Sequence, residues 1–234
     1  MIDRPLVITI DGPAGVGKST VAKRLAKRLG LLYVDTGATY RTLAYAALLK
    51  GVDLQDARAL VRLADSVRIT LQQPTAGLLR VRLDGRDVTR HIRTERVTEA
   101  AAVVAQHPQV RDAMVRLQRR LARRSRLVIE GRDTGTVVFP RASHKFFLTA
   151  KAAIRARRRQ RELRSVQGRA PSLAVIVRQL RRRDGLDLKR TVGPLVKPDG
   201  AVVVDTSSLT AGQVVSRLLR HLSTPNGARQ VSDT

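Results

Sequence analysis

The sequence predicts an α/β protein built around a parallel sheet, and three observations support this prediction. Apolar and amphipathic stretches follow one another over the first fifty residues in the order strand, helix, strand, helix. Hydrophobic residues make up 43% of the 234 residues, which suffices for one domain with a sizeable core. Aromatic residues make up only 3%, so Val, Leu, Ile and Ala must fill that core, as in sheets covered by helices on both faces.

The first elements follow from the order of apolar runs and glycines. Residues 6–10 form an apolar run that predicts a buried strand, followed by a glycine-rich turn and a helix over 18–29. Gly30 is a suitable helix stop. A second strand is expected over 31–34 and a second helix over 37–49, ending at Gly51.

The pattern changes after about residue 66. Apolar and polar residues alternate over 67–71 and again over 79–83, with turns expected at 74–77 and at 84–85. This is the pattern of antiparallel hairpins. We therefore expect a small inserted subdomain over about 66–93.

The remaining chain returns to helices and strands within what we expect to be a single domain over 1–223. A polar, proline-flanked stretch extends to residue 198, and the polar tail 224–234 is expected to be disordered. Strands are predicted over 127–129, 145–148 and 201–204, and helices over 94–105, 108–124, 151–166, 172–183 and 211–222.

The net charge of +26 is the most unusual bulk property. Residues 151–190 hold 14 Lys and Arg against three acidic residues. Guanidinium groups bind phosphate in a bidentate manner, so this segment suits phosphate handling at an active site. It also suits a solvated basic helix face, and the charge allows weak, salt-sensitive binding of nucleic acid.

Composition also bears on where the protein works. Cysteine is absent, which excludes disulfides and thiolate metal sites and agrees with a reducing compartment. The apolar run at 6–10 is too short for a membrane span or a signal-peptide core. We expect a cytoplasmic protein without membrane association. No strong exposed apolar stripe is evident, so we also expect a monomer.

Residues 12–19 read GPAGVGKS and match the phosphate-loop pattern G-x-x-x-x-G-K-[ST], with a strand before and a helix after it. The glycines let backbone N–H groups converge on an anion at the helix N-terminus. Lys18 is expected to neutralise the β- and γ-phosphates, and the Ser19 hydroxyl to bind Mg²⁺. The residues expected around the ATP phosphates are Gly12, Pro13, Ala14, Gly15, Val16, Gly17, Lys18, Ser19 and Thr20.

The loop predicts a nucleoside triphosphate but not its use. A GTPase would need an Asn-Lys-x-Asp motif, and the single asparagine is Asn226 in the tail. A motor or transporter ATPase is usually larger. The length therefore favours a small-molecule kinase with ATP as the phosphoryl donor.

Five further segments are similar to the bacterial cytidylate kinase family. They lie in family order between about residues 6 and 220, and together they are far more specific than any one of them. The segments are DTGATYR at 35–41, EGRDTGTVVFP at 130–140, KFFLTA at 145–150 with RARR at 155–158, RDGLDLKR at 183–190 with PL at 194–195, and VDTS at 204–207.

The resemblance implies a P-loop nucleoside-monophosphate-kinase fold. This fold has a parallel five-stranded core sheet flanked by helices, an acceptor-binding insert and an arginine-rich lid. The antiparallel section at 66–93 fits the insert, and the basic stretch at about 151–198 fits the lid. The implied reaction is Mg-assisted, in-line transfer of the γ-phosphoryl group of ATP to CMP or dCMP, in pyrimidine nucleotide metabolism.

By the same resemblance, arginines serve both phosphate groups. Arg41 and Arg132 hold the acceptor phosphate, and Arg190 adds a contact nearby. A phosphate acceptor has a second pKa of ~6 and needs no general base, so none of the four histidines has to take part. The lid arginines expected to reach the transferring phosphates are Arg155, Arg158 and Arg183, for which a plain surface charge is the alternative.

Other polar residues are assigned by the resemblance to the rest of the substrate. Thr36 and Tyr40 contact the nucleotide, and Arg183 and Asp187 touch the ribose. Glu130, at a strand end, organises Mg²⁺ through water, although a structural ion pair is an open alternative.

Arg111 and Asp133 resemble the pair that reads the cytosine edge. A carboxylate accepts from the N4 amino group while a guanidinium donates to N3 and O2. Uracil would set its O4 acceptor against the carboxylate, and buried mismatches of this kind are costly. Alternatively, Asp133 anchors a neighbouring arginine.

One departure from the family concerns base binding. The family usually carries a serine in a segment that here reads AAVVA over 101–105, so Ala102 lacks the hydroxyl. One lost hydrogen bond costs ~1 kcal/mol, and we expect weaker cytosine binding rather than another reaction.

Two alternative functions remain at this stage. One is a P-loop kinase for another small acceptor, such as UMP, AMP or shikimate. The other is an arginine-rich nucleic-acid-binding protein, although few aromatic residues are available to stack on bases.

Overall fold

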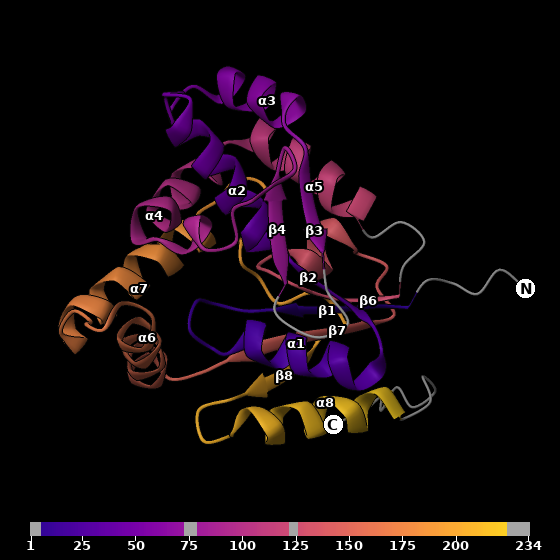
Figure 1. Cartoon of the computed structure of the whole chain (residues 1–234). Coiled ribbons are helices and arrows are strands. Elements are labelled where there is room, and N and C mark those ends of the chain that lie inside the picture. The colour runs from indigo at the N-terminus through magenta and orange to yellow at the C-terminus, as the bar shows by residue number, and fades with distance from the viewer. Residues whose placement is uncertain (1–5, 73–78, 122–125, 224–234) are drawn as a thin grey trace, which may run out of the picture.

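A five-stranded parallel sheet forms the centre of the computed structural model, which describes residues 6–72, 79–121 and 126–223 (Figure 1). All of its paired neighbours run parallel, as the sequence predicts. The order across the sheet is β2 (Leu32–Asp35), β6 (Leu127–Glu130), β1 (Val7–Asp11), β7 (His144–Thr149) and β8 (Val202–Asp205).

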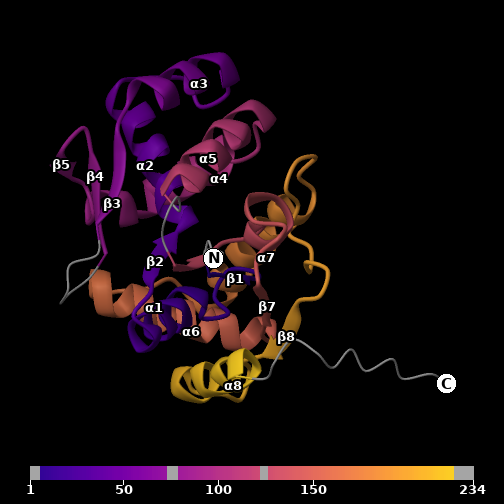
Figure 2. The same cartoon turned by 90° about the vertical axis from the view of Figure 1, so that its right-hand side faces the viewer.

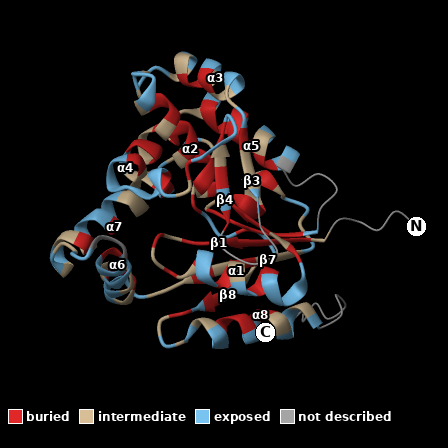
Figure 3. Ribbon diagram, in the orientation of Figure 1, coloured by how far each residue is buried: buried red, intermediate tan, exposed pale blue. Residues whose placement is uncertain are grey.

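Helices cover both faces of this sheet. Helix α1 (Lys18–Leu29) packs on α8 (Ala211–Ser223), and Figure 2 shows these two helices on the same side of the sheet. Helix α5 (Pro108–Leu121) contacts the short π-helix η2 (Thr134–Val138), which also contacts β1. The central strands β1 and β6 are buried along their whole length (Figure 3). Burial on both faces explains why these strands read as continuous apolar runs.

A second, antiparallel sheet lies beside helices α2 to α5. It consists of β3 (Ile69–Gln72), β4 (Arg80–Leu83) and β5 (Arg86–Asp87). The predicted antiparallel section is confirmed, including the turn at 84–85. The turn expected at 74–77 lies outside the described residues. The neighbouring helices are α2 (Thr36–Leu49), α3 (Ala57–Ser66), the 3₁₀ helix η1 (His91–Arg93) and α4 (Glu95–Val104).

Local signals set most helix ends. Gly30 ends α1 with φ of +64°, a left-handed conformation that glycine adopts at little cost. Asp35, Thr94 and Ser172 each accept a hydrogen bond from a backbone N–H in the first turn of the helix they precede. These caps agree with the predicted starts to within one or two residues.

The structure differs from the sequence predictions in several elements. Helices α3, η1 and η2 and the short strand β5 were not predicted. Helix α7 (Leu173–Leu188) continues five residues beyond the predicted end, through Gly185, and Asp187 in this added turn pairs with Arg132 from just after β6. The predicted helix over 108–124 is α5, and residues 122–125 and the tail 224–234 lie outside the described part.

Helices α6 (Ala152–Gln167) and α7 form an antiparallel pair at the edge of the molecule (Figure 1). Apolar side chains of the pair pack against Ala14 of the glycine-rich loop, so the pair lies next to that loop. The buried members are Ala156, Leu163, Ile176 and Leu180. Within residues 6–72, 79–121 and 126–223, no helix has the length and apolar character needed to cross a membrane.

Candidate active site

A cavity of about 860 Å³ opens where the parallel strands end. Three neighbouring strands end there in acidic residues, which are Asp11 of β1, Glu130 of β6 and Asp35 of β2. In open α/β sheets, ligands bind at the carboxyl ends of the strands. The walls are the glycine-rich loop, the starts of α1 and α2, parts of α4 to α7, and the segment 206–211 after β8.

The glycine-rich loop wraps around the N-terminus of α1. Gly12, Gly15 and Gly17 have φ values of +144°, +79° and +96°, and a side chain at Gly12 would collide with the carbonyl oxygen of Leu148. Gly17 caps α1 without a side-chain hydrogen bond, which leaves the helix N-terminus available to an anion. This is the geometry of a phosphate loop.

Lys18 lies buried within this loop. Its Nζ donates hydrogen bonds of 2.7 Å to the carbonyl oxygens of Gly12 and Pro13. Burial, followed by the charge of Arg132, lowers the pKa of Lys18 to about 7. An anionic phosphate in the loop would favour the charged ammonium.

Ser19 and Glu130 face each other across the floor of the cavity. The Ser19 hydroxyl donates to Glu130 Oε1 at 2.6 Å, and the Tyr33 hydroxyl donates to the same oxygen at 3.2 Å. Burial and the neighbouring Asp35 raise the pKa of Glu130 above its ordinary value. Hydroxyl and carboxylate oxygens are donors that suit Mg²⁺. In the described part of the chain no three His, Cys, Asp or Glu side chains are grouped so that they could hold a metal ion by themselves, so substrate phosphates and water would have to complete such a site.

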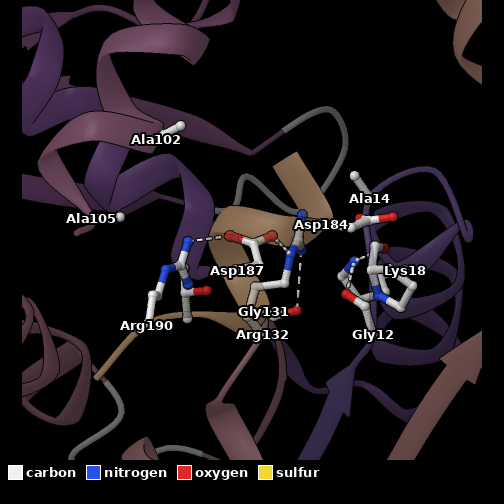
Figure 4. A network of polar contacts seen from close by, with 12 residues as sticks. Gly12, Ala14, Lys18, Ala102, Ala105, Gly131, Arg132, Asp184, Asp187 and Arg190 are labelled. Atoms are coloured by element: carbon white, nitrogen blue, oxygen red, sulfur yellow. Dashed lines mark hydrogen bonds and ion pairs between the residues drawn. The ribbon is translucent and has the colours of Figure 1, made fainter. Parts of the chain in front are cut away.

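Asp187 joins two arginines from different parts of the chain. Arg132, just after β6, donates from Nε to Asp187 Oδ2 at 2.7 Å, and Arg190 donates to Oδ1. Figure 4 shows Asp187 between the two guanidinium groups. Burial alone would raise the pKa of Asp187, but the two arginines hold it below its ordinary value. This arrangement fixes two cations on the cavity wall.

Two further arginines face the cavity with different degrees of restraint. Arg41 pairs with Asp35 at 2.9 Å, and Asp35 also caps α2 through the Ala38 N–H. Arg183 is half-buried and forms no hydrogen bond or ion pair within the described ranges. Burial and the nearby Arg132 lower the pKa of Arg183 to about 10, so it stays charged at neutral pH and is free to bind an anion.

Arg111 and Asp133 form a buried ion pair at the other end of the cavity. The Arg111 guanidinium also lies over the ring of Tyr40, 5.6 Å from its centre. Ala102 of α4 lines the same cavity and brings no hydroxyl to it. Gly193, with φ of +61°, packs so closely on the pair that a side chain there would collide with both partners.

Arg155 and Arg158 tie α6 to the phosphate loop. Arg155 donates to the carbonyl oxygen of Ala14 at 3.1 Å and to Asp184 Oδ2 at 2.6 Å. Arg158 donates to the Thr206 hydroxyl and carbonyl oxygen at 2.9 and 2.6 Å. Arg158 lines the cavity, but Arg155 points its guanidinium into the packing behind the loop.

The structure thus brings most of the expected site residues to one cavity. The exceptions are Gly12, Pro13 and Arg155, which lie behind its wall. Thr36, Tyr40, Arg41, Arg111, Glu130, Arg132, Asp133, Arg158, Arg183, Asp187 and Arg190 all line it, as do residues 14–20 of the loop.

Sequence reasoning missed Arg93 of η1 and the segment 207–211. Arg93 lines the cavity and is the single member of the described part of 66–93 that does so. The antiparallel sheet instead packs against α2, and its apolar face joins the core through Ile69, Val81 and Leu83. Helix α4 forms this wall of the cavity. No distinctive sequence signal marks Arg93.

A phosphate loop at the start of α1 and a facing wall of arginines, on a parallel α/β sheet, define a P-loop kinase of the small-molecule class. The model of the family described as cytidylate kinase matches residues 8–224. A cytidylate kinase of Pelotomaculum thermopropionicum is 47% identical over 216 residues, covering 92% of this chain and 95% of that protein. One of Symbiobacterium thermophilum is 44% identical over 218 residues, covering 93% and 96%. The chain belongs to the cytidylate kinase family, as the five segments indicated.

The fold also occurs in a solved structure of low sequence similarity. An uncharacterised protein of Eubacterium ventriosum superimposes with a TM-score of 0.50 at 10% identity, covering 94% of this chain and 99% of that one. This likeness concerns the fold alone.

Proposed function

We propose that the protein transfers the γ-phosphoryl group of ATP to CMP or dCMP, giving ADP and CDP or dCDP. The observation that carries this proposal is the buried Arg111–Asp133 pair, which lines the same cavity as the phosphate loop. Such a pair can match the edge of a pyrimidine base, which presents an amino donor beside ring-nitrogen and carbonyl acceptors, and shikimate has no such edge.

The donor end of the proposed site is the loop at 12–20. Backbone N–H groups and Lys18 bind the ATP phosphates, and the Ser19 hydroxyl would hold Mg²⁺, with Glu130 acting on it through water. Bound Mg²⁺ would neutralise negative charge on the phosphates. The hydrogen bond between Ser19 and Glu130 supports this assignment because it places both oxygen donors at one point.

The acceptor phosphate is assigned to arginines that are already oriented. Arg41 is held by Asp35, and Arg132 and Arg190 are held by Asp187. Preorganised cations lose little conformational entropy when the anion arrives and bring two anionic groups together for in-line transfer.

The transferring phosphoryl group is assigned to Arg158 and Arg183. Arg183 supports this best, since it has no partner of its own in the described structure and lines the cavity. Arg155 does not line the cavity and is bonded to Ala14 and Asp184, so we assign it to positioning the loop, whereas Arg158 lines the cavity while it is bonded to Thr206. Asp187 and Arg183 contact the ribose, and Thr36 and Tyr40 complete the nucleotide pocket.

The base is read by the buried pair. Asp133 accepts from the cytosine N4 amino group, and Arg111 donates to O2 and N3. Uracil and adenine present different donors and acceptors at these positions, and a buried polar mismatch is rejected strongly.

An ADP-release assay with ATP and Mg²⁺ tests the proposal, with CMP, dCMP, UMP, AMP and shikimate offered in parallel. We expect turnover to be dominated by CMP and dCMP. Turnover on UMP, AMP or shikimate instead would retain a kinase but overturn the assignment of Arg111 and Asp133. No ADP release with any of the five acceptors would overturn the proposed reaction.

A further inference from the structure

Asp11 is the last residue of β1 and stands directly before the phosphate loop. Its side chain is fully buried. Oδ1 accepts hydrogen bonds from the backbone N–H and the hydroxyl of Thr134 at 2.9 and 2.8 Å, and Oδ2 accepts from the Gly135 N–H at 2.8 Å. A carboxylate that ends the donor strand therefore binds a segment 123 residues further along the chain.

These donors belong to the first turn of η2, and Asp133 occupies the position before that turn. The first N–H groups of a helix lack partners within it, and an aspartate at the capping position usually accepts from them. Asp133 makes no such bond. Its carboxylate pairs with Arg111 instead.

We propose that Asp11 is a positioning residue for base selectivity: by capping η2 from β1, it leaves the Asp133 carboxylate free to face Arg111 and the base. This inference rests on the proposed function, in which Asp133 reads the cytosine amino group. In that function Asp11 contacts no substrate and acts only through the orientation of Asp133.

The chemistry of the contact requires a carboxylate. Three donors converge on Asp11, whose ionised side chain is acceptor-only. An asparagine in its place has one acceptor oxygen, and its NH₂ group would face one of the N–H donors of η2 without an acceptor between them. Burial raises the pKa of Asp11 to about 6, which leaves it ionised at neutral pH.

Close packing prevents η2 from adjusting by a shift. A side chain at Gly135 would lie 2.9 Å from both the Thr9 hydroxyl and a ring carbon of Pro198. With η2 fixed against β1, the response available after loss of Asp11 is rotation of the Asp133 side chain toward the freed N–H groups. That rotation would remove it from Arg111.

The experiment compares Asp11→Asn with the wild type, using kcat/KM for CMP and for UMP and the KM for ATP. We expect the ratio of kcat/KM for CMP over UMP to fall about tenfold, the effect of losing about 1.4 kcal/mol of discrimination. The change should lie in the KM for CMP, while the KM for ATP is unchanged. Asp56→Asn, which removes the same charge from an exposed cap of α3, should leave the ratio as it is.

Thr134→Val provides a second variant in case Asp11→Asn folds poorly. It removes the hydroxyl donor and keeps both backbone contacts, so the ratio should fall in the same direction by a smaller factor. A crystal structure of Asp11→Asn should show the Asp133 carboxylate turned toward the N–H groups of residues 134 and 135.

The outcomes separate the two proposals. An equal loss of kcat/KM for both acceptors, a raised KM for ATP, or Asp133 still paired with Arg111 in the Asp11→Asn crystal would overturn the role of Asp11. A wild type that does not prefer CMP over UMP would instead overturn the proposed function, and the crystal structure would still decide whether Asp11 controls the orientation of Asp133.

Discussion

The Ser19 hydroxyl donates a hydrogen bond of 2.6 Å to Glu130, which joins the phosphate loop to the end of β6. If both oxygens organise Mg²⁺, then Glu130→Gln keeps an acceptor for Ser19 but removes the charge that attracts the metal. We expect the Mg²⁺ concentration for half-maximal activity to rise about tenfold, as for other groups next to metal ligands.

A Mg²⁺ titration at saturating ATP measures this change. Glu99→Gln, which neutralises an exposed carboxylate of α4 outside the cavity lining, is the matched control. An unchanged Mg²⁺ requirement in Glu130→Gln would assign Glu130 a structural role only.

Asp187 holds Arg132 and Arg190 in a largely buried setting, so its neutralisation affects both folding and binding. Removing one partner from a buried ionic network typically costs about 3 kcal/mol. We expect Asp187→Asn to lower the free energy of unfolding by about that amount and to raise the KM for CMP at least about tenfold. Urea denaturation and steady-state kinetics measure the two effects, and stability equal to the wild type would contradict the network.

Arg183 has no partner to lose among the described residues, so we expect its substitution to affect catalysis but not stability. Arg183→Ala should lower kcat by ~10³, as the loss of a catalytic arginine does in related phosphoryl transfers. The melting temperature should stay within error of the wild type. The adjacent and exposed Arg182, changed to alanine, is the control for the loss of a lid charge. A similar kcat for the two variants would remove Arg183 from the transfer step.

Ala102 offers a gain-of-function test because it lines the cavity without a hydroxyl. Ala102→Ser should lower the KM for CMP about fivefold, which corresponds to one hydrogen bond of ~1 kcal/mol. Val103→Ser places a hydroxyl one residue further along the same helix and should not lower it. Steady-state kinetics with varied CMP at fixed ATP measure the KM for CMP. An unaltered KM in Ala102→Ser would mean that another group or a water molecule already makes this hydrogen bond to the base.

Lys18 predicts a pH dependence of stability. Its pKa is about 7 in the folded protein and 10.5 without the fold, so the unfolded chain binds more protons between these values. The free energy of unfolding therefore rises with pH between these two values. Below pH 7 the charged ammonium is buried at its full energetic cost, and above pH 7 the folded protein increasingly buries the neutral amine instead.

Thermal unfolding of Lys18→Met and of the wild type at pH 6.5 and 9.5 measures the contribution of Lys18 to the pH dependence of stability. We expect the variant to be the more stable at the lower pH, with a difference that shrinks at the higher pH. Lys27→Met, an exposed change of the same kind in the same helix, is the matched control. Parallel pH curves for Lys18→Met and wild type would contradict the depressed pKa.

Local sequence signals predicted the elements that local interactions determine. The bounds of α1 match the prediction because Gly17 and Gly30 mark both ends in the sequence. The phosphate loop and the antiparallel strands were also predictable, since each depends on residues that are close in the chain.

Long-range contacts account for what the sequence did not predict. Helix α7 continues past Gly185 to a turn in which Asp187 is held by Arg132, a residue just after β6 and far away in the sequence. Arg155 was expected in the cavity, but its side chain satisfies Ala14 and Asp184 instead. The role of Asp11 depends on Thr134 and Gly135, and no spacing rule links positions so far apart.

The bonds from Arg155 to Ala14 and from Arg158 to Thr206 have a mechanical consequence. They make the first turns of α6 a pivot that is fixed to the nucleotide-binding body. If the α6–α7 pair rotates, it rotates about this anchored start of α6, and the helix ends furthest from the phosphate loop are displaced most. A substitution that removes either bond would therefore loosen the attachment of α6 to the residues around the phosphate loop.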